Sequence, residues 1–234
     1  MPEDPRPQQN RLLAALPSDI QQRLFSHLEY IALPLGKVLY EPGRALCRAY
    51  FPIDSIVSQL YVMANGASTE ISVIGNEGMV GTALFMGGES RLSRIVVQGG
   101  GSGYRMHGKH LKEEFNRHGK LQELMLRYIQ SLIVQMSQTA VCNRHHSIGQ
   151  QLCRWLLLSL DRLPGNQLTM TQELIANMLG VRREGVTEAA GKLQRQGVIA
   201  YSRGRITVLD RQKLEQLSCE CYAVVKRATD RLLP

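Results

Sequence analysis

One stretch of the chain runs for more than twenty residues without a proline or a glycine, and it separates two differently patterned parts of the sequence. The segment "KLQELMLRYIQSLIVQMSQTAVCN" ends at Asn143, and an uninterrupted run of this kind predicts one long α-helix. Its apolar positions follow a 4-3-4-3 spacing, which is typical of a helix that packs along a second helix. We therefore predict a homodimer interface, with packing on the chain's own sheet as the alternative. The predicted interface residues are Met125, Ile129, Leu132 and Met136.

Before this helix, residues 31–106 consist of short apolar segments separated by turns. Glycine or asparagine recurs every eight to twelve residues, which is typical of an antiparallel β-sandwich or a small β-barrel. The period differs just upstream, because apolar side chains recur at helical spacing from Leu12 to Leu28. We expect short amphipathic helices there, followed by an all-β domain.

After the long helix the chain becomes basic. Residues 144–234 contain 14 Lys and Arg against 8 Asp and Glu, whereas residues 1–143 contain 14 against 12. Most of the formal net charge of +8 therefore lies in the C-terminal third, which favours an acidic partner such as nucleic acid. The hydrophobic content of 44% excludes a wholly disordered chain.

The C-terminal third contains a helix-turn-helix pattern followed by a hairpin pattern. In "TQELIANMLGVRREGVTEAAGKLQ", Thr171 is a suitable N-cap for a first helix, and Gly180 can adopt a positive φ between the helices. The side chains expected to face inward are Leu174, Ile175 and Met178 in the first helix and Val186, Ala189, Ala190 and Leu193 in the second. The next segment, "VIAYSRGRITVL", alternates on both sides of Arg203-Gly204, which predicts a β-hairpin with arginines at its tip.

Together these segments resemble the Crp/Fnr family of bacterial transcription regulators. The similarity extends over nearly the whole chain and rests on "LYEPG", "NEGMVG", "WLLLSLDR", "TQELIANMLGVRREGVTEAAGKLQ" and "CECY". The resemblance implies an α+β fold in three parts. These are an N-terminal antiparallel β-barrel of the jelly-roll, cyclic-nucleotide-binding-like type (11–118), a long dimerisation helix (119–143) and a C-terminal winged helix-turn-helix DNA-binding domain (144–234).

The implied function is sequence-specific regulation of transcription by a homodimer. Its partner is double-stranded DNA with a near-palindromic operator, because the second helix of each protomer enters the major groove and a two-fold axis relates the two. RNA polymerase is a further implied partner. One rival hypothesis is a sensor that acts through a protein partner and whose DNA-binding domain is vestigial.

Carried over by position, the resemblance assigns two kinds of DNA contact. The implied base-reading residues are Arg183, Glu184, Thr187 and Glu188, since arginine can bond guanine and glutamate can accept from cytosine. The implied phosphate contacts are Thr171, Gln172, Arg182, Arg203 and Arg205. Two positions depart from the family pattern. Glu188 stands where the best-known member has arginine, and Arg182 stands where a small hydroxyl cap is common.

The β-domain departs from the family's cyclic AMP site. That site needs a Gly-Glu pair for the ribose and an arginine for the phosphate, yet Gly78 is followed by Met79, and Ser93 falls at the arginine position beside Arg94. We expect these four residues to mark a candidate effector pocket that does not depend on ordinary cyclic AMP. No cofactor is predicted and the effector is unknown. The alternative is a sensor gated by a cyclic nucleotide, cyclic di-GMP, haem or redox, whose DNA binding requires that effector.

The cysteines favour a reducing compartment and no metal site. Five are scattered without C-x-x-C spacing. Cys219 and Cys221 are two positions apart, so on a helix they are expected to point to different faces and to be buried thiols. The adjacent His145 and His146 are likewise expected to point apart, as polar residues at a helix end.

Other function classes find no support in the sequence. The start "MPEDPRPQQN" lacks a signal region and no apolar run could span a bilayer, so we expect a cytoplasmic protein without a membrane partner. A nucleophile elbow, a phosphate loop and an H-E-x-x-H motif are all lacking, so no enzyme is predicted. The glycine-rich run Gly99–Gly103 is expected to be a flexible turn between strands.

Overall fold

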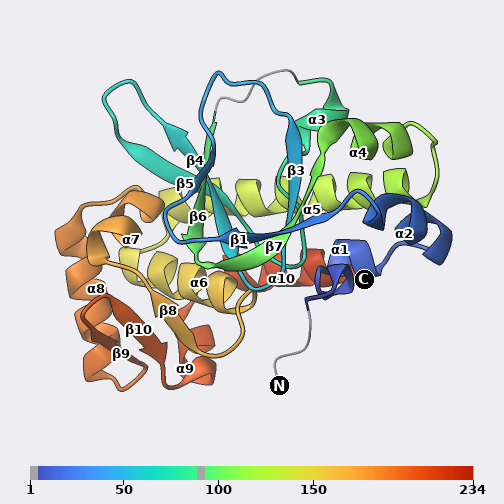
Figure 1. The fold of residues 1–234 in the computed structure, drawn as a ribbon. Coiled ribbons are helices and arrows are strands. Elements are labelled where there is room, and N and C mark those ends of the chain that lie inside the picture. The colour runs from blue at the N-terminus through green and yellow to red at the C-terminus, as the bar shows by residue number, and fades with distance from the viewer. Residues whose placement is uncertain (1–4, 89–92, 234) are drawn as a thin grey trace.

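The computed structural model describes residues 5–88 and 93–233 of the chain. A β-rich N-terminal part and a mainly helical C-terminal part lie side by side, and the long helix α5 (Lys120–His145) runs behind the β-rich part (Figure 1). Helix α5 covers the stretch that the sequence predicts as one long helix. Within the described ranges, no helix combines the length and the apolar character needed to cross a membrane.

Seven strands of the N-terminal part form two antiparallel sheets that enclose an apolar core. The first sheet has the order β1-β7-β3, with β1 (Glu29–Leu33), β7 (Gly101–His107) and β3 (Arg48–Pro52). The second has the order β2-β6-β4-β5, with β2 (Val38–Tyr40), β6 (Ser93–Gly99), β4 (Ile56–Val62) and β5 (Ser68–Ile74). The predicted α+β jelly-roll fold is confirmed. Over the described residues the two sheets pair separately rather than closing into one barrel.

Short helices close the end of this sandwich. They are the 3₁₀ helix η1 (Pro7–Gln9), α1 (Arg11–Ala14), α2 (Ser18–Phe25), α3 (Ala83–Met86) and α4 (Gly108–Phe115). Asn10, between η1 and α1, is fully buried and attaches this segment to the β-rich part. Its Nδ2 donates to Pro52 O and Gly78 O, each at 2.9 Å. Its Oδ1 also accepts from Leu13 N, which caps α1.

The glycine-rich run is not a turn, contrary to the expectation. Strand β6 continues to Gly99 and β7 begins at Gly101. A Cβ at Gly101 would come within 2.5 Å of Asp54 O, and one at Gly103 within 2.6 Å of Phe51 O. The run therefore permits close packing of backbones rather than flexibility.

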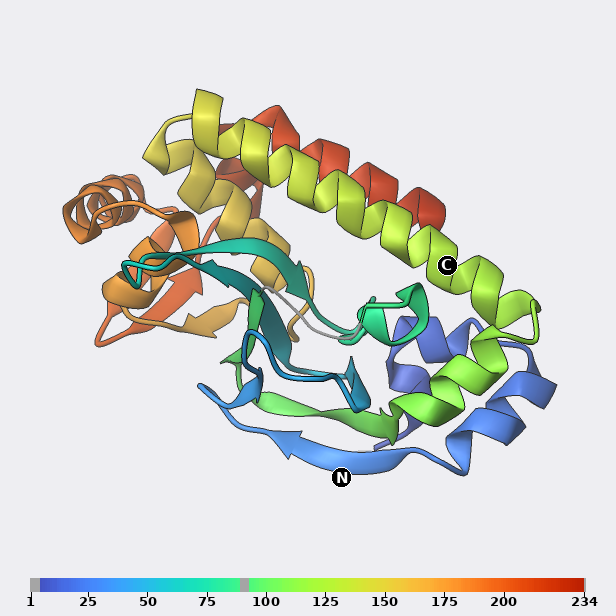
Figure 2. The same ribbon diagram turned by 90° about the horizontal axis from the view of Figure 1, so that it is seen from above.

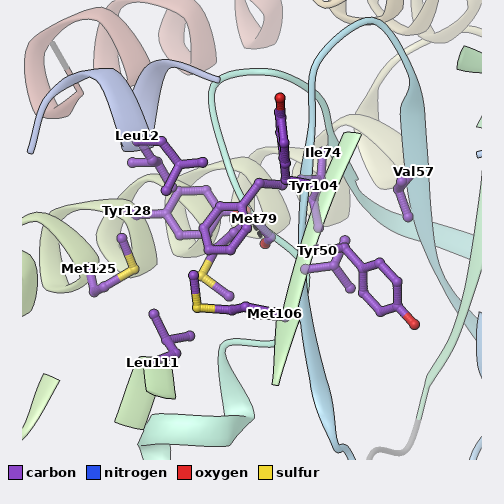
Figure 3. Packing of buried hydrophobic residues seen from close by; sticks show 14 of the residues in the cluster. Leu12, Tyr50, Val57, Ile74, Met79, Tyr104, Met106, Leu111, Met125 and Tyr128 are labelled. Carbon is purple, nitrogen blue, oxygen red and sulfur yellow. Dashed lines mark hydrogen bonds between the residues drawn. The ribbon is translucent and has the colours of Figure 1, made fainter. Parts of the chain in front are cut away.

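The first core lies between the two sheets and α5. Figure 3 shows Tyr128 and Met125 of α5 packed against Met79, Leu12 and Met106. The Tyr128 hydroxyl donates to Met79 O at 2.8 Å. Gln135, further along α5, pairs with the outer edge of the sheet: its Oε1 accepts from Val73 N at 2.6 Å and its Nε2 donates to Val73 O at 3.2 Å.

The C-terminal part has its own set of elements. The helices are α6 (Ile148–Leu160), α7 (Gln172–Leu179), α8 (Arg183–Arg195), α9 (Arg211–Leu217) and α10 (Glu220–Leu232), and the strands are β8 (Gln167–Thr169), β9 (Ile199–Ser202) and β10 (Arg205–Val208). Helix α10 runs back along α5 (Figure 2). The strands form a sheet in the order β8-β10-β9, of which the sequence analysis missed β8.

The second core joins the two parts of the molecule. Val57 and Ile74 of the four-stranded sheet face the first core, whereas Ile56, Leu60 and Val73 face the second core together with side chains of α6 to α10. Because alternate residues of a strand point to opposite faces, the sheet is covered on both sides. The C-terminal part is therefore packed on the outer face of this sheet.

A buried ion pair crosses between the two parts. Arg162, just after α6, donates from Nε to Glu77 Oε1 at 2.6 Å, and the two side chains are only 5% and 8% exposed. Arg162 Nη1 also donates to Leu158 O, and Glu77 Oε2 accepts from Gly75 N. A Cβ at Gly75 would come within 2.5 Å of Arg162 Cβ, so the glycine admits the arginine stem.

Glu77→Gln should lower the free energy of unfolding by about 3–5 kcal/mol, because Arg162 would stay buried without its counter-charge. Urea denaturation followed by circular dichroism measures the change. The matched control is Glu41→Gln, which removes the half-exposed partner of Arg94 and should cost less than about 1 kcal/mol. Equal effects of the two substitutions would contradict a structural role for the buried pair.

Glu70 is a second buried acid between the two parts. It is 7% exposed on the face of β5 that meets the C-terminal part, and its Oε2 accepts from Ser58 Oγ at 2.6 Å. Burial raises the pKa of Glu70 to about 7, against opposing effects of the Ser58 hydrogen bond and the Arg154 and Arg162 charges. The folded chain therefore holds a proton on Glu70 that the unfolded chain has lost above its ordinary pKa of 4.5.

The free energy of unfolding should accordingly fall as the pH rises. The contribution of the protonated Glu70 is fully present below pH 4.5 and is lost as the pH passes through about 7. Glu70→Gln should remove this dependence, which amounts to at most about 3 kcal/mol. Urea midpoints of the wild type, Glu70→Gln and the exposed-site control Glu41→Gln between pH 5 and pH 8 measure it. An unchanged slope in Glu70→Gln would contradict the shifted pKa.

Candidate nucleic-acid interface

Helices α7 and α8 form the predicted helix-turn-helix. The Thr171 hydroxyl accepts from Leu174 N at 3.2 Å, so Thr171 is the N-cap of α7. Gly180 ends α7 in the left-handed region, with φ of 66°. Ile175 and Met178 are buried as expected, but Leu174 is 40% exposed. Its position in the first turn leaves it at the edge of the apolar face.

The turn also touches the N-terminal part. A Cβ at Gly180 would come within 2.5 Å of Thr69 Oγ1 on β5, so the backbone of the turn lies directly against the β4–β5 hairpin. The glycine is required twice, once by its positive φ and once by this contact.

Helix α8 is anchored by one face and leaves the other exposed. Val186, Ala190 and Leu193 are buried over α6, and Ala189 is partly buried. Gly185 lies so close to α6 that a Cβ there would meet Ile148 Cδ1 at 2.7 Å. The predicted base-reading residues, which are Arg183, Glu184, Thr187 and Glu188, are all exposed.

Arg182 occupies the N-cap position of α8 and makes no capping hydrogen bond from its side chain. The first-turn backbone N–H groups of α8 therefore lack the side-chain cap that a serine or threonine would give. The N-terminal end of α8 presents partial positive charge together with two exposed arginines, Arg182 and Arg183.

The hairpin β9–β10 forms the predicted wing. Its two-residue turn has positive φ at both positions, 48° at Arg203 and 76° at Gly204, which is the geometry of a type I′ turn. The wing is fixed to the start of α7, because Tyr201 OH donates to Met170 O at 2.8 Å and Met170 N donates to Gly204 O at 2.6 Å.

A groove of about 600 Å³ lies between α8 and the wing. Five of the residues predicted for DNA contact line it: Thr171, Gln172, Arg183, Thr187 and Arg203. Thr187 Oγ1 is within hydrogen-bond distance of Gln172 Oε1 at 2.7 Å and of Arg183 O at 3.0 Å, and its one proton can serve only one of them. Arg182, Glu184, Glu188 and Arg205 are exposed outside the lining of the groove.

The groove also contains residues that the sequence analysis did not select. Gln194, Tyr201 and Ser202 line it. Gln194 follows Thr187 by seven positions, which is two helical turns, so helical periodicity could have identified it. Tyr201 and Ser202 would have required the hairpin register, in which Ser202 pairs with Arg205.

The predicted DNA-contacting arginines are not neutralised by the protein. No carboxylate lies within 4.0 Å of the guanidinium groups of Arg182, Arg183, Arg203 or Arg205, as far as the described chain goes. By contrast, Arg211 on the adjacent helix α9 pairs with Asp161 and Glu215. The four arginines therefore keep their charge and donors available to an anionic ligand.

The four residues of the candidate effector pocket are engaged in different contacts. Met79 is fully buried, and a Cβ at Gly78 would come within 2.6 Å of Tyr128. Ser93 is buried and accepts from Gln59 Nε2 at 3.0 Å, whereas the half-exposed Arg94 pairs with Glu41 at 2.9 Å. The Tyr128 ring thus lies against the loop where the family's nucleotide site would offer its acid.

The predicted dimer residues lie on two sides of α5. Met125 and Leu132 are buried in the chain's own core, and Ile129 and Met136 are partly buried against it. A second apolar row with the same 3-4 spacing is more accessible, and it consists of Leu126, Ile129, Ile133, Met136 and Ala140. Leu126 is 54% and Ile133 51% exposed. The two rows share Ile129 and Met136, and the outer row has Leu126 and Ile133 in place of Met125 and Leu132.

The expectation that Cys219 and Cys221 point apart is wrong. Cys219 is the N-cap of α10 and has extended backbone angles, so the pair does not follow helical spacing. Both thiols, with Cys142 and His146, belong to one group whose ligand atoms lie within 4.8 Å of one another. His146 is therefore not a plain surface residue, and its side chain is only 14% exposed.

Comparison with known proteins connects this geometry to a family. Residues 150–217 match the family model described as the Crp-like helix-turn-helix domain. The global nitrogen regulator of Synechococcus elongatus is 22% identical to this chain over 191 residues, which are 77% of this chain and 86% of that protein.

Two solved structures have a similar fold. A Crp/Fnr-family regulator from Eubacterium rectale matches with a TM-score of 0.70 at 17% identity, covering 90% of this chain and 98% of that one. The c-di-GMP-responsive global regulator CLP of Xanthomonas campestris matches with a TM-score of 0.64 at 16% identity, covering 83% of this chain and all of that one. At these identities the likeness shows the fold, while the helix-turn-helix match includes every residue that lines the groove.

Proposed function

Because the chain is a transcription regulator of the Crp/Fnr type, we propose that it binds duplex DNA selectively through α8 and the wing. The observation that carries this proposal is the exposed N-terminal end of α8, where unpaired arginines flank a groove that the wing closes on its other side. A recognition helix enters the major groove with this end first.

Two sets of contacts follow from that placement. Arg183 would bond a guanine, Glu184 and Glu188 would accept from cytosine amino groups, and Thr187 would contact a base edge. The proposed phosphate contacts are Thr171, Gln172, Arg182, Arg203 and Arg205. Arg203 and Arg205 lie at the tip of the wing, where the DNA backbone would run.

We propose that DNA binding does not depend on cyclic AMP. The supporting observation is that Tyr128 packs against Met79 in the loop that would hold the ribose of a nucleotide. Both side chains are buried, and the Tyr128 hydroxyl donates to Met79 O. The division of the chain at residues 118 and 143 into sensor, dimerisation helix and DNA-binding domain is part of the same proposal. A transcription regulator of this kind acts in the cytoplasm, where bacterial DNA lies.

Arg183→Ala should weaken binding at the cognate base by about 1–3 kcal/mol and relax specificity there. The measurement is fluorescence anisotropy with a sequence first selected from genomic fragments by the wild type, at several salt concentrations. Arg195→Ala is the matched control, because Arg195 is an exposed arginine at the opposite end of the same helix. It should leave specificity unchanged.

An equal loss on all sequences in Arg183→Ala would make Arg183 a phosphate contact instead. Parallel titrations with cyclic AMP and with cyclic di-GMP test the effector part of the proposal. Unchanged affinity with cyclic AMP is expected, and a requirement for either nucleotide would replace it with a ligand-gated regulator.

We propose that the protein works as a homodimer through the outer row of α5. Leu126 and Ile133 stand out on this row, while the inner row is already covered by the chain's own sheets. Heptad spacing on an exposed helix face is what a two-helix seam requires. Two-fold symmetry then implies a near-palindromic operator, with half-sites about one turn of DNA apart. RNA polymerase as a further partner follows from the family resemblance alone.

Ile133→Glu should convert the dimer into a folded monomer, because it places a charge at the centre of the outer row. Analytical ultracentrifugation should show a dissociation constant raised by at least about tenfold. Met86→Glu is the control, since Met86 is a comparably exposed apolar residue on α3, away from α5. A dimer of unchanged affinity in Ile133→Glu would contradict the assigned interface.

A further inference from the structure

Four side chains meet where the C-terminal end of α5 lies beside the start of α10. Cys142 lies in the last turn of α5 and His146 is its C-cap, while Cys219 is the N-cap of α10 and Cys221 lies in its first turn. Their ligand atoms all lie within 4.8 Å of one another. Cys142 Sγ lies 3.5 Å from Cys219 Sγ, and Cys221 Sγ lies 3.6 Å from His146 Nδ1.

The local backbone explains why they converge. His146 is the C-cap of α5, and its backbone N–H donates to Cys142 O at 3.0 Å, which holds it one turn beyond Cys142. Cys219 precedes the first turn of α10 with an extended ψ of 165°, which brings its thiol to the same side as that of Cys221. Helix α10 packs along α5 (Figure 2), so the two pairs face each other.

The distances fit the ligands of one tetrahedral ion. Zinc–sulfur bonds of about 2.3 Å at tetrahedral angles place two sulfur atoms about 3.8 Å apart. The Cys142–Cys219 separation of 3.5 Å is close to that value, whereas a disulfide would need about 2.05 Å. Three thiolates and an imidazole form a donor set that selects zinc over magnesium or calcium.

The histidine is held in the orientation that a ligand needs. Its Nε2 lies 3.3 Å from Glu220 Oε2, in position to donate a hydrogen bond to that carboxylate. This leaves the lone pair of Nδ1 directed at the cysteines. A carboxylate behind the distal nitrogen of a histidine is the usual outer partner of a zinc ligand.

A buried arginine supplies charge near the cluster. Three thiolates around one divalent zinc ion carry a single net negative charge. Arg154 on α6 is 4% exposed, and within residues 5–88 and 93–233 its guanidinium has hydrogen bonds only to Thr139 Oγ1, while its Nε has no partner.

We propose that Cys142, His146, Cys219 and Cys221 bind one structural zinc ion. All four ligands come from the protein, which is typical of a structural rather than a catalytic zinc site. The ion ties the C-terminal end of α5 to the start of α10. Because the chain turns from α5 into α6 directly after His146, this tie also fixes the junction between the long helix and the DNA-binding part.

The first test is the metal content of the full chain, purified under reducing conditions without a polyhistidine tag. Inductively coupled plasma mass spectrometry should find about one zinc ion per chain. After removal of zinc with a chelator, titration with Co²⁺ should give thiolate-to-cobalt charge transfer and the intense visible bands of a tetrahedral site. Chelated protein should melt at least about 5 °C lower and recover when zinc is returned.

Variants assign the ligands. Cys142→Ser and Cys221→Ser should each lose zinc and the cobalt charge-transfer bands. Cys153→Ser is the matched control, because Cys153 is a buried cysteine on α6 outside the group, and it should keep both. Glu220→Gln should retain the site but weaken zinc binding by about 10–100-fold.

Three results would overturn the proposal. One is wild-type protein with neither zinc nor a tetrahedral cobalt spectrum, a measurement that does not depend on any variant folding. Another is a Cys142–Cys219 disulfide, seen by mass spectrometry of protein alkylated at the moment of lysis. The third is full zinc occupancy in Cys142→Ser and Cys221→Ser, which would place the ion elsewhere.

Discussion

The double burial of the four-stranded sheet holds the two parts of the molecule in one arrangement. Strands β4, β5 and β6 send alternate side chains into the core under α5 and into the core of the C-terminal part. A shift of pairing register by one residue would exchange these two sets of side chains, so both cores depend on the same register. The same boundary also buries polar contacts, namely the Ser58–Glu70 hydrogen bond and the Glu77–Arg162 ion pair.

The loop from Gly75 to Met79 lies at the same boundary and is packed from both sides. Two glycines allow Arg162 and Tyr128 to approach the loop backbone, and the tyrosine then bonds to Met79 O. In the family pattern this loop offers a carboxylate to a nucleotide. Here the one acid of the loop, Glu77, points to an arginine of the C-terminal part instead. Through this ion pair the loop connects the N-terminal part to the C-terminal part.

Periodic patterns in the sequence predicted the large elements well. The long helix, the β-rich region, the helix-turn-helix and the wing depend on local signals such as Gly180 and the Arg203-Gly204 turn, and all are present. The spacing of α5 was also correctly identified, but two rows of apolar residues share Ile129 and Met136. A single sequence cannot say which row the chain's own sheets will cover.

Convergence of distant residues was beyond prediction for a different reason. Cys142 and Cys219 are 77 positions apart, and their approach depends on how α10 packs against α5. The i, i+2 spacing of Cys219 and Cys221 predicts divergent side chains only if both residues are helical, and Cys219 lies outside the helix. Strand β8, with only three residues, gave no periodic signal at all.

The contact between Gly180 and Thr69 connects the N-terminal part directly to the turn before α8. In this chain the β4–β5 hairpin lies against the turn between α7 and α8, where a Cβ at Gly180 would come within 2.5 Å of Thr69 Oγ1. A movement of the hairpin towards this turn would therefore act on the start of α8 directly, in addition to any movement passed through α5.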